Sequence, residues 1–148
     1  MSAVLRRFRQ MKVVPVPVRQ DNYSYLLIDD ATRHAAAVDP FDVPKLQAAA
    51  AQPELDVRII ANITTHHHFD HSGGNKVFLE RPFPAADADA LIGICTSNGL
   101  SQSFYDPFRQ ALRFPSAPIY GGSDKVQALT KLVKDKDEFF IGDNIHVK

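Results

Sequence analysis

The order of strand and helix patterns in this chain predicts one domain of the α/β or α+β class. Three strand patterns open the sequence with no helix between them, as in a β-meander, and helix and strand patterns follow one another after that. A length of 148 residues fits a single domain. Hydrophobic residues make up 45% of the chain and charged residues 23%, so the composition favours a folded core over general disorder.

Each opening strand is rich in valine, alanine or aromatic residues and is bounded by a proline or a polar turn; the three run over 12–18, 23–28 and 34–39. Pro15 and Pro17 cannot donate to a strand ladder, so the first strand is expected at a sheet edge. Residues 21–22 are a turn signal. Tyr23 and Tyr25 share one face of the second strand by alternation, and we expect both in the core, with substrate contacts as the alternative.

Helix and strand patterns continue beyond the meander. An alanine-rich helix at 43–52 tolerates Pro44 in its first turn. A nearly continuous apolar run at 57–64 predicts a strand covered on both faces. Apolar residues at helical spacing after Ser123, a suitable N-cap, predict a helix over 123–134. The other expected elements are a short helix at 76–80, a strand at 119–122, and a hairpin with strands at 139–141 and 145–147.

Two stretches stand apart in the predicted domain, which spans 12–148. Residues 1–11 form a basic leader. We interpret it as an ordinary start of a cytoplasmic protein, and a mitochondrial targeting segment is the alternative. The segment at about 81–118 holds five of the ten prolines and no lysine, and no hydrophobic period persists across it. We therefore expect an irregular insertion outside the main sheets.

The charge balance excludes some partners. Seventeen Lys and Arg residues balance seventeen Asp and Glu residues, so the chain carries no net field to attract nucleic acid or an anionic membrane. No apolar run reaches the roughly 18 residues that a membrane-spanning helix needs. The single cysteine, Cys95, cannot form an internal disulfide.

The segment that carries chemistry is 64–75, which contains four of the six histidines. His66 and His68 are two residues apart at the end of a predicted strand, so both project to one side and can reach one metal ion. Asp70 and His71 follow where the chain turns and can serve a second ion. Two ions roughly 3.5–4 Å apart can hold a hydroxide and polarise a carbonyl, so the spacing suggests a binuclear hydrolase.

The neighbours of these residues support the same interpretation. Gly73 and Gly74 let the backbone turn tightly into the next helix. Phe69 is expected to pack. A solvated surface loop is the alternative interpretation, but it explains neither the Asp-His pair, nor the glycines, nor the apolar strand that leads into the loop.

The residues at 65–71, Thr-His-His-His-Phe-Asp-His, match the THxHxDH signature of the metallo-β-lactamase superfamily. The chain resembles that superfamily over roughly 11–80 and 119–148. Its flanking segments are similar to those of glyoxalase II, the hydroxyacylglutathione hydrolases: DNYSYLLI at 21–28, AVDP at 37–40, TTHHHFDHSGGN at 64–75 and IYGG at 119–122.

This resemblance implies an αββα sandwich, of which the chain would supply the N-terminal part. It also implies hydrolysis of S-D-lactoylglutathione, a glutathione thioester, to D-lactate and glutathione, a step in methylglyoxal detoxification. By position, His66 and His68 would bind a first divalent metal ion, and Asp70 and His71 a second. Zinc is expected at both positions, with iron or manganese as alternatives.

Two further residues are expected to support the metal ligands without binding an ion. The resemblance places Asp39 near the site, where it would hold ligands by hydrogen bonds. A plain strand-ending turn with Pro40 is an equally supported interpretation of that residue. His67 lies between the two facing histidines, so it points away from the ions and serves a supporting or structural role.

The resemblance is incomplete, because the family's later metal ligands and its glutathione-recognising residues follow the position of Lys148. We therefore expect an N-terminal fragment that is inactive alone, with the missing C-terminal half or a full-length chain as a partner. The alternatives are another enzyme of the superfamily, such as a persulfide dioxygenase, a lactonase or a β-lactamase, and a non-catalytic truncated metal-binding product. The neutral charge argues against a nuclease.

Overall fold

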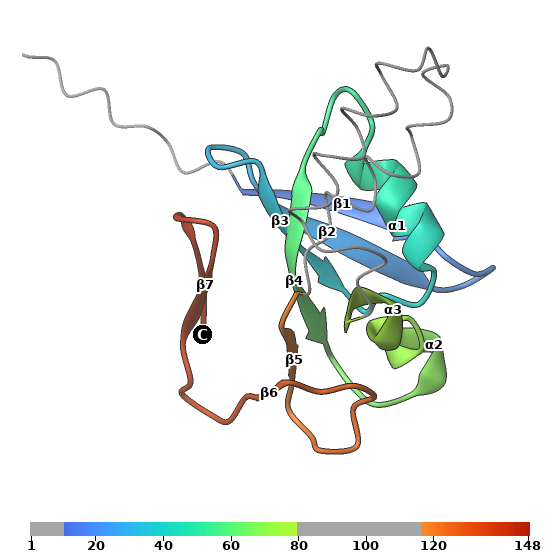
Figure 1. Cartoon of the computed structure of the whole chain (residues 1–148), viewed down its shortest axis with the longest axis vertical. Helices are drawn as coiled ribbons and strands as arrows, with labels where there is room; N and C mark the ends of the chain where they lie inside the picture. The colour runs from blue at the N-terminus through green and yellow to red at the C-terminus, as the bar shows by residue number, and fades with distance from the viewer. Residues whose placement is uncertain (1–10, 80–116) are drawn as a thin grey trace, which may run out of the picture.

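The computed structural model describes residues 11–79 and 117–148, which form a mixed six-stranded sheet, three helices and a separate hairpin (Figure 1). The expected leader and nearly all of the expected insertion lie outside the described residues. In chain order the elements are β1 Met11–Pro17, β2 Tyr23–Asp29, β3 His34–Val38, α1 Val43–Ala50, β4 Arg58–Thr64, α2 Phe69–Ser72, α3 Asn75–Leu79, β5 Ile119–Gly121, β6 Lys131–Leu132, β7 Phe139–Ile141 and β8 Ile145–Val147.

The sheet is antiparallel at one end and parallel at the other. Strands β1, β2 and β3 form the expected meander, and β3, β4, β5 and β6 follow in parallel, in the spatial order β1-β2-β3-β4-β5-β6. Strand β1, with Pro15 and Pro17, lies at the edge as predicted. The parallel arrangement matters for function, because it brings the carboxyl ends of β3 and β4 to the same edge of the sheet.

Helix α1 covers one face of the sheet and closes the larger core. The Asp42 carboxylate caps the helix by accepting the Lys45 N–H at 3.2 Å, and Pro44 occupies the first turn as predicted. Val43, Leu46 and Ala50 pack against the strands. The strand side chains in this cluster come from alternate positions of β1 to β4: Val16, Leu26, Ile28, Ala35, Ala37 and Ile59.

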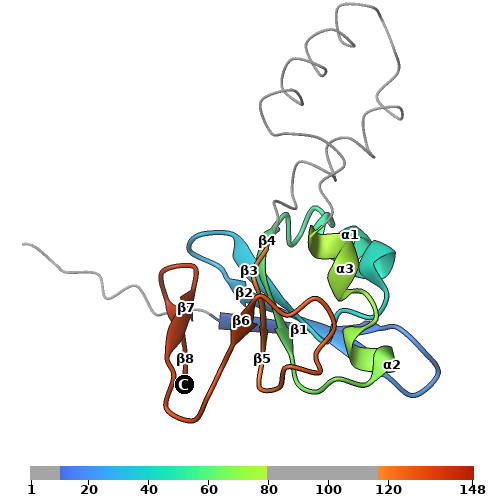
Figure 2. The ribbon, with the colours of Figure 1, turned by 60° about the horizontal axis from the view of Figure 1, so that its bottom comes forward.

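The β7–β8 hairpin covers part of the opposite face, as Figures 1 and 2 show with the sheet between the hairpin and the helices. Ile141 and Ile145 pack on Ala36 and Ala61, and the β4 strand is therefore covered on both faces, as its continuous apolar run predicted. The turn of the hairpin is tied to β2 through the Asp29 carboxylate, which accepts the Asp143 N–H at 2.9 Å and the Asn144 N–H at 3.1 Å.

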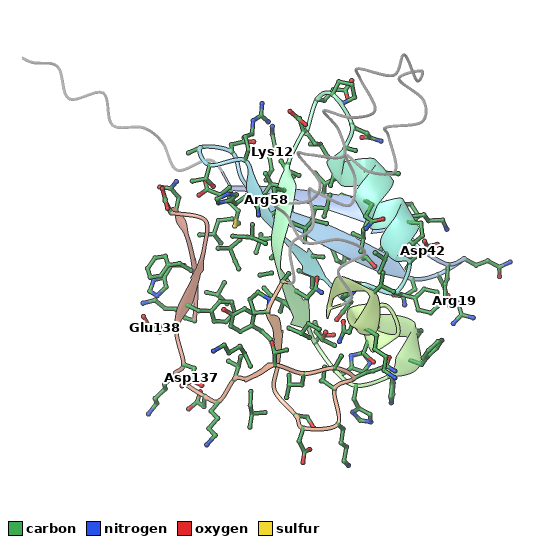
Figure 3. All side chains as sticks on the ribbon, viewed as in Figure 1. Lys12, Arg19, Asp42, Arg58, Asp137 and Glu138 are labelled. Carbon is green, nitrogen blue, oxygen red and sulfur yellow. The ribbon has the colours of Figure 1, made fainter. Side chains whose placement is uncertain are left out.

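Charged side chains occur on both sides of this arrangement. Figure 3 places Arg19 and Asp42 on the helical side of the sheet, and Asp137 and Glu138 on the side of the hairpin. Among the described residues, no helix is long and apolar enough to cross a membrane.

The helix predicted over 123–134 is wrong. This segment forms turns and the short strand β6, and Ala128 adopts a left-handed φ of 58°, which no α-helix continues through. Val126 and Leu129 lie over Gly121, where an added Cβ would meet their side chains at 3.0 and 3.1 Å. Thr130 returns the chain to β5, because its hydroxyl accepts the Ile119 N–H at 2.7 Å. The apolar spacing thus reflects contacts of turns with β5 rather than a helix face.

The expectation that Tyr23 and Tyr25 are core residues is also wrong for the described chain. Both lie on one face of β2, as alternation requires, but they are 46% and 38% exposed. The hairpin covers this face only farther along β2, at Leu27 and Asp29. Val13 on β1, which pairs with Leu27, is 54% exposed.

Candidate metal centre

The predicted metal ligands lie in the loop and short helix that follow β4. The parallel register pairs Val38 with Ile63, so Asp39 at the end of β3 and Thr65 after the end of β4 become neighbours. The loop then passes His66 and His67 and enters α2 at His68, whose extended φ and ψ of −61° and 145° place it at the N-cap.

Local hydrogen bonds and close packing fix this loop. The hydroxyl of Ser72, which is buried, shares its one hydrogen between the carbonyl oxygens of His67 at 3.1 Å and His68 at 3.0 Å. Gly74 packs directly against the segment after β3, where a Cβ would overlap the Pro40 carbonyl oxygen and meet Val43 Cγ2 at 2.7 Å. The glycine is therefore needed for close approach of two segments.

Three imidazole rings gather at this position. The His66 and His68 ring centroids are 4.7 Å apart, and those of His66 and His71 are 4.1 Å apart. Oδ2 of Asp70 lies 3.4 Å from Nε2 of His71. His66 and His68 thus lie on the same side of the loop, and all four residues that the sequence predicts as metal ligands are brought together. Metal binding by these residues stays a prediction.

Asp39 forms the centre of the hydrogen-bond network behind the rings. Its side chain is 8% exposed. Oδ1 accepts the Thr65 N–H at 2.7 Å, and Oδ2 accepts the Thr65 hydroxyl at 2.7 Å and lies 3.0 Å from Nδ1 of His71. Asp39 also ends β3 with a left-handed φ of 50°. Both interpretations weighed from the sequence therefore describe its position: it forms the strand-ending turn and it contacts a candidate ligand.

This network selects the tautomers of two histidines. A carboxylate only accepts, so Nδ1 of His71 must carry the hydrogen that it shares with Asp39. Thr65 donates its own hydrogen to Asp39, so its oxygen must accept from Nδ1 of His66, 3.0 Å away. In the neutral form, each ring then keeps the lone pair of Nε2 for a metal ion.

His67 and Phe69 alternate with the candidate ligands. His67 is exposed, and its ring centroid is 5.1 Å from that of His68. Phe69 is 68% exposed, so the expectation that it packs holds only for one edge: its ring contacts that of Phe41 edge to face at 5.7 Å. The Arg19 guanidinium lies over Phe41, 5.3 Å from the ring centroid.

The donor types fit a divalent metal ion, since neutral imidazole and carboxylate are ligands for zinc, iron and manganese. The number of donors fits only in part. Within 11–79 and 117–148, no group of three or more His, Cys, Asp or Glu side chains is arranged to hold one ion. Catalytic zinc sites usually have three protein ligands, so these residues amount to part of such a site.

Two contributors to the site were missed from the sequence. Asn22 was interpreted only as a turn residue, although its side chain reaches Asp70 across the fold. Asn75, fully buried, bonds the Thr64 hydroxyl at 3.0 Å and the Gln127 carbonyl at 2.9 Å, and so anchors the start of α3 to the end of β4. Asn22 lies within the segment DNYSYLLI and Asn75 ends the segment TTHHHFDHSGGN, and the resemblance of both segments to glyoxalase II was the one available signal.

Comparison with known proteins defines the family. The model of the metallo-beta-lactamase superfamily matches residues 21–139, and the chain belongs to that superfamily. The chain is also similar in fold to a crystal structure of ETHE1 from Myxococcus xanthus, with a TM-score of 0.50 and 19% sequence identity. The match covers 90% of this chain and 44% of the ETHE1 chain. The fold class inferred from the sequence is confirmed: the mixed sheet with its helices has the metallo-β-lactamase fold.

Three similar curated proteins are named as hydroxyacylglutathione hydrolases. The chain is 50% identical over 66 residues to the cytoplasmic hydroxyacylglutathione hydrolase of Arabidopsis thaliana and 46% identical over 67 residues to the hydroxyacylglutathione hydrolase of Dictyostelium discoideum. It is 38% identical over 115 residues to a protein of Schizosaccharomyces pombe named "Probable hydroxyacylglutathione hydrolase". These matches cover 45%, 45% and 73% of this chain but only 25%, 25% and 42% of the relatives.

Proposed function

We propose that this chain supplies the N-terminal part of a metal-dependent thioester hydrolase that converts S-D-lactoylglutathione to D-lactate and glutathione. The single observation that carries the proposal is the cluster of His66, His68, Asp70 and His71, in which His71 is hydrogen-bonded to Asp39. The names of the curated relatives support the substrate class, a 2-hydroxyacyl thioester of glutathione.

In this proposal His66 and His68 hold one divalent ion, and Asp70 and His71 hold a second. Zinc is the expected metal, with iron or manganese as alternatives. When bound, such ions lower the pKa of a water molecule and polarise a carbonyl oxygen, which are the two requirements of thioester hydrolysis.

The chain's own residues orient the ligands. Asp39 keeps the hydrogen of His71 on Nδ1 by direct contact, and Thr65 does the same for His66. Supporting partners of this kind are worth about 10–100-fold in metal affinity or activity in known metal sites. Thr65 and Asp39 are therefore expected to matter for metal binding although neither is a ligand.

The described residues alone are proposed to be inactive, because they offer two donors per ion where catalytic zinc usually has three. The activity then needs donors from a partner, either the C-terminal half of such an enzyme or a full-length chain. The same shortage favours a second candidate function, a non-catalytic metal-binding product. A cytoplasmic location is part of the proposal, since one relative is named for it.

A chimera tests this function. Residues 11–148 are joined to the part of the Schizosaccharomyces pombe relative that they do not match, and loss of the thioester of S-D-lactoylglutathione is followed with and without a chelator. We expect metal-dependent hydrolysis that His68→Ala abolishes and that His34→Ala, at the opposite end of β3, leaves intact. Hydrolysis of a lactone or oxidation of a persulfide without thioester hydrolysis would assign the chain to another enzyme of the superfamily.

A further inference from the structure

The β1–β2 turn touches the metal loop through one side chain. In Figures 1 and 2 this turn lies beside α2. The Asn22 amide nitrogen donates to the carbonyl oxygen of Asp70 at 2.9 Å and lies 3.4 Å from its Oδ2. The two residues are 48 positions apart, so the contact joins the meander to the candidate site.

Asn22 is itself held in place. Its side-chain oxygen accepts the Tyr23 N–H at 2.9 Å, which fixes the amide so that the nitrogen faces Asp70. Its backbone oxygen accepts the Val18 N–H at 3.1 Å and closes the turn. A donor anchored on both sides can orient its acceptor, whereas a freely rotating one cannot.

Asp70 needs such a partner because little else restrains it. Its side chain is 40% exposed, and Nε2 of His71, 3.4 Å from Oδ2, carries no hydrogen in the neutral tautomer that Asp39 selects, so it donates no bond to the carboxylate. Asn22 approaches the same oxygen, Oδ2, and also the backbone of Asp70. It therefore limits both the position of the residue and the rotation of its carboxylate.

We propose that Asn22 is a positioning residue that orients the Asp70 carboxylate for a divalent metal ion. This inference rests on the metal site of the proposed function and adds a residue outside the histidine motif. The amide is neutral and acts only as a donor toward Asp70, so it constrains the carboxylate without competing for the ion.

The test compares the complete chain with Asn22→Ala and with Asn144→Ala as the matched control. Asn144 is likewise an asparagine whose amide donates to an aspartate, at 3.1 Å, but in the hairpin turn. The measurements are the dissociation constants of Zn²⁺ by competition with a chelator, the visible spectrum of bound Co²⁺, and amide exchange of α2 without metal. Asn22→Ala is expected to raise the dissociation constant of one of the two Zn²⁺ ions by about 10–100-fold and to change the Co²⁺ spectrum. Asn144→Ala is expected to change neither.

A second variant separates loss of the bond to Asp70 from loss of the β1–β2 turn. Asn22→Asp keeps the acceptor for the Tyr23 N–H but offers Asp70 no hydrogen, so it is also expected to change the Co²⁺ spectrum. Unchanged spectra and affinities in both variants would overturn the inference, as would faster amide exchange with unchanged metal binding. Absence of metal binding by the parent chain would overturn the metal site together with this inference. Weakened binding in Asn22→Ala alongside an inactive chimera would refute only the thioester substrate.

Discussion

Asp29 ties the hairpin to the sheet, and replacing it with asparagine tests how much this tie stabilises the fold. The residue is 1% exposed, and its carboxylate accepts the N–H groups of Ala31, Asp143 and Asn144 at 3.1, 2.9 and 3.1 Å. The amide of Asn144 donates to it as well, at 3.1 Å. Gly142, with a φ of 60°, lets the turn approach so closely that a Cβ would meet Oδ2 of Asp29 at 2.5 Å.

The size of the effect follows from these bonds. In Asp29→Asn one carboxylate oxygen becomes an NH₂ group, which faces a donor whichever way the amide is turned. At least one buried donor then loses its acceptor, and the remaining bonds lose their charge. A hydrogen bond to a charged group contributes about 1.5–3 kcal/mol and a neutral one about 0.5–1.5 kcal/mol, so we expect a loss of roughly 2–4 kcal/mol in the free energy of unfolding.

The same bonds make this stabilisation depend on pH. Burial raises the pKa of Asp29, but the hydrogen bonds from the Asn144 side chain and from the backbone of Asp143 and Ala31 outweigh it, and the net pKa lies below the ordinary value of 3.8. A carboxyl group whose pKa is lower in the folded state stabilises the fold at pH values above its unfolded-state pKa. This contribution is lost as the pH falls through the folded-state pKa. The difference between parent and Asp29→Asn should therefore be full at pH 7 and shrink below about pH 4.

Urea unfolding at pH 7 and at pH 3, with hydrogen exchange of β7 and β8, measures both effects. Asp30→Asn is the matched control, because it removes the neighbouring carboxylate, whose partner is the half-exposed Lys12 at 3.2 Å. Surface ion pairs of this kind contribute about 0.2–1 kcal/mol. Equal losses in Asp29→Asn and Asp30→Asn, or an Asp29→Asn effect that does not change between pH 7 and pH 3, would refute the reasoning.

Two further substitutions test packing near the site. Gly74→Ala should lower the stability by about 1–3 kcal/mol in thermal unfolding, because its Cβ would overlap the Pro40 carbonyl oxygen; an unchanged melting temperature would show that the two segments move apart freely. Asn62→Val should raise the stability by about 1–3 kcal/mol, because the Asn62 amide is fully buried and has no hydrogen-bond partner among the described residues. Asn75→Ala is the comparison, since this buried amide is bonded and its loss should destabilise; a destabilising Asn62→Val would mean that the Asn62 amide is satisfied.

Patterns that act over a few residues were sufficient to predict most of the fold. The meander, α1, β4 and the closing hairpin depend on alternation, alanine content and turn residues, and each is found within two residues of its expected position. The helix expected over 123–134 failed because the apolar spacing there reflects packing of Val126 and Leu129 on Gly121, a contact between turns and a strand.

The candidate site divides in the same way. The candidate ligands His66, His68, Asp70 and His71 stand in one short motif, so their spacing alone indicated their grouping. The bond from Asn22 to Asp70 joins residues 48 positions apart, and the one from Asn144 to Asp29 joins residues 115 apart. Such long-range contacts depend on the tertiary fold, and no local sequence pattern predicts them.

Within residues 11–79 and 117–148, part of one face of β1 and β2 is left exposed. Tyr23 and Tyr25 were expected in the core, but they are 46% and 38% exposed, and Val13 on β1 is 54% exposed. Their exposure follows from the reach of the β7–β8 hairpin, which ends its contacts at Leu27, Asp29 and the neighbouring strands.

Titration of the complete chain with Zn²⁺, read as the number of ions bound per chain, tests most directly whether the histidine loop holds a pair of metal ions. Two ions are expected for the parent chain. Replacing His68 with alanine should leave one, replacing Asp70 with alanine should remove the other, and replacing His34 should change nothing. A parent chain that binds no ion, or a stoichiometry that His68→Ala and Asp70→Ala leave unchanged, would contradict the assignment of these residues as metal ligands.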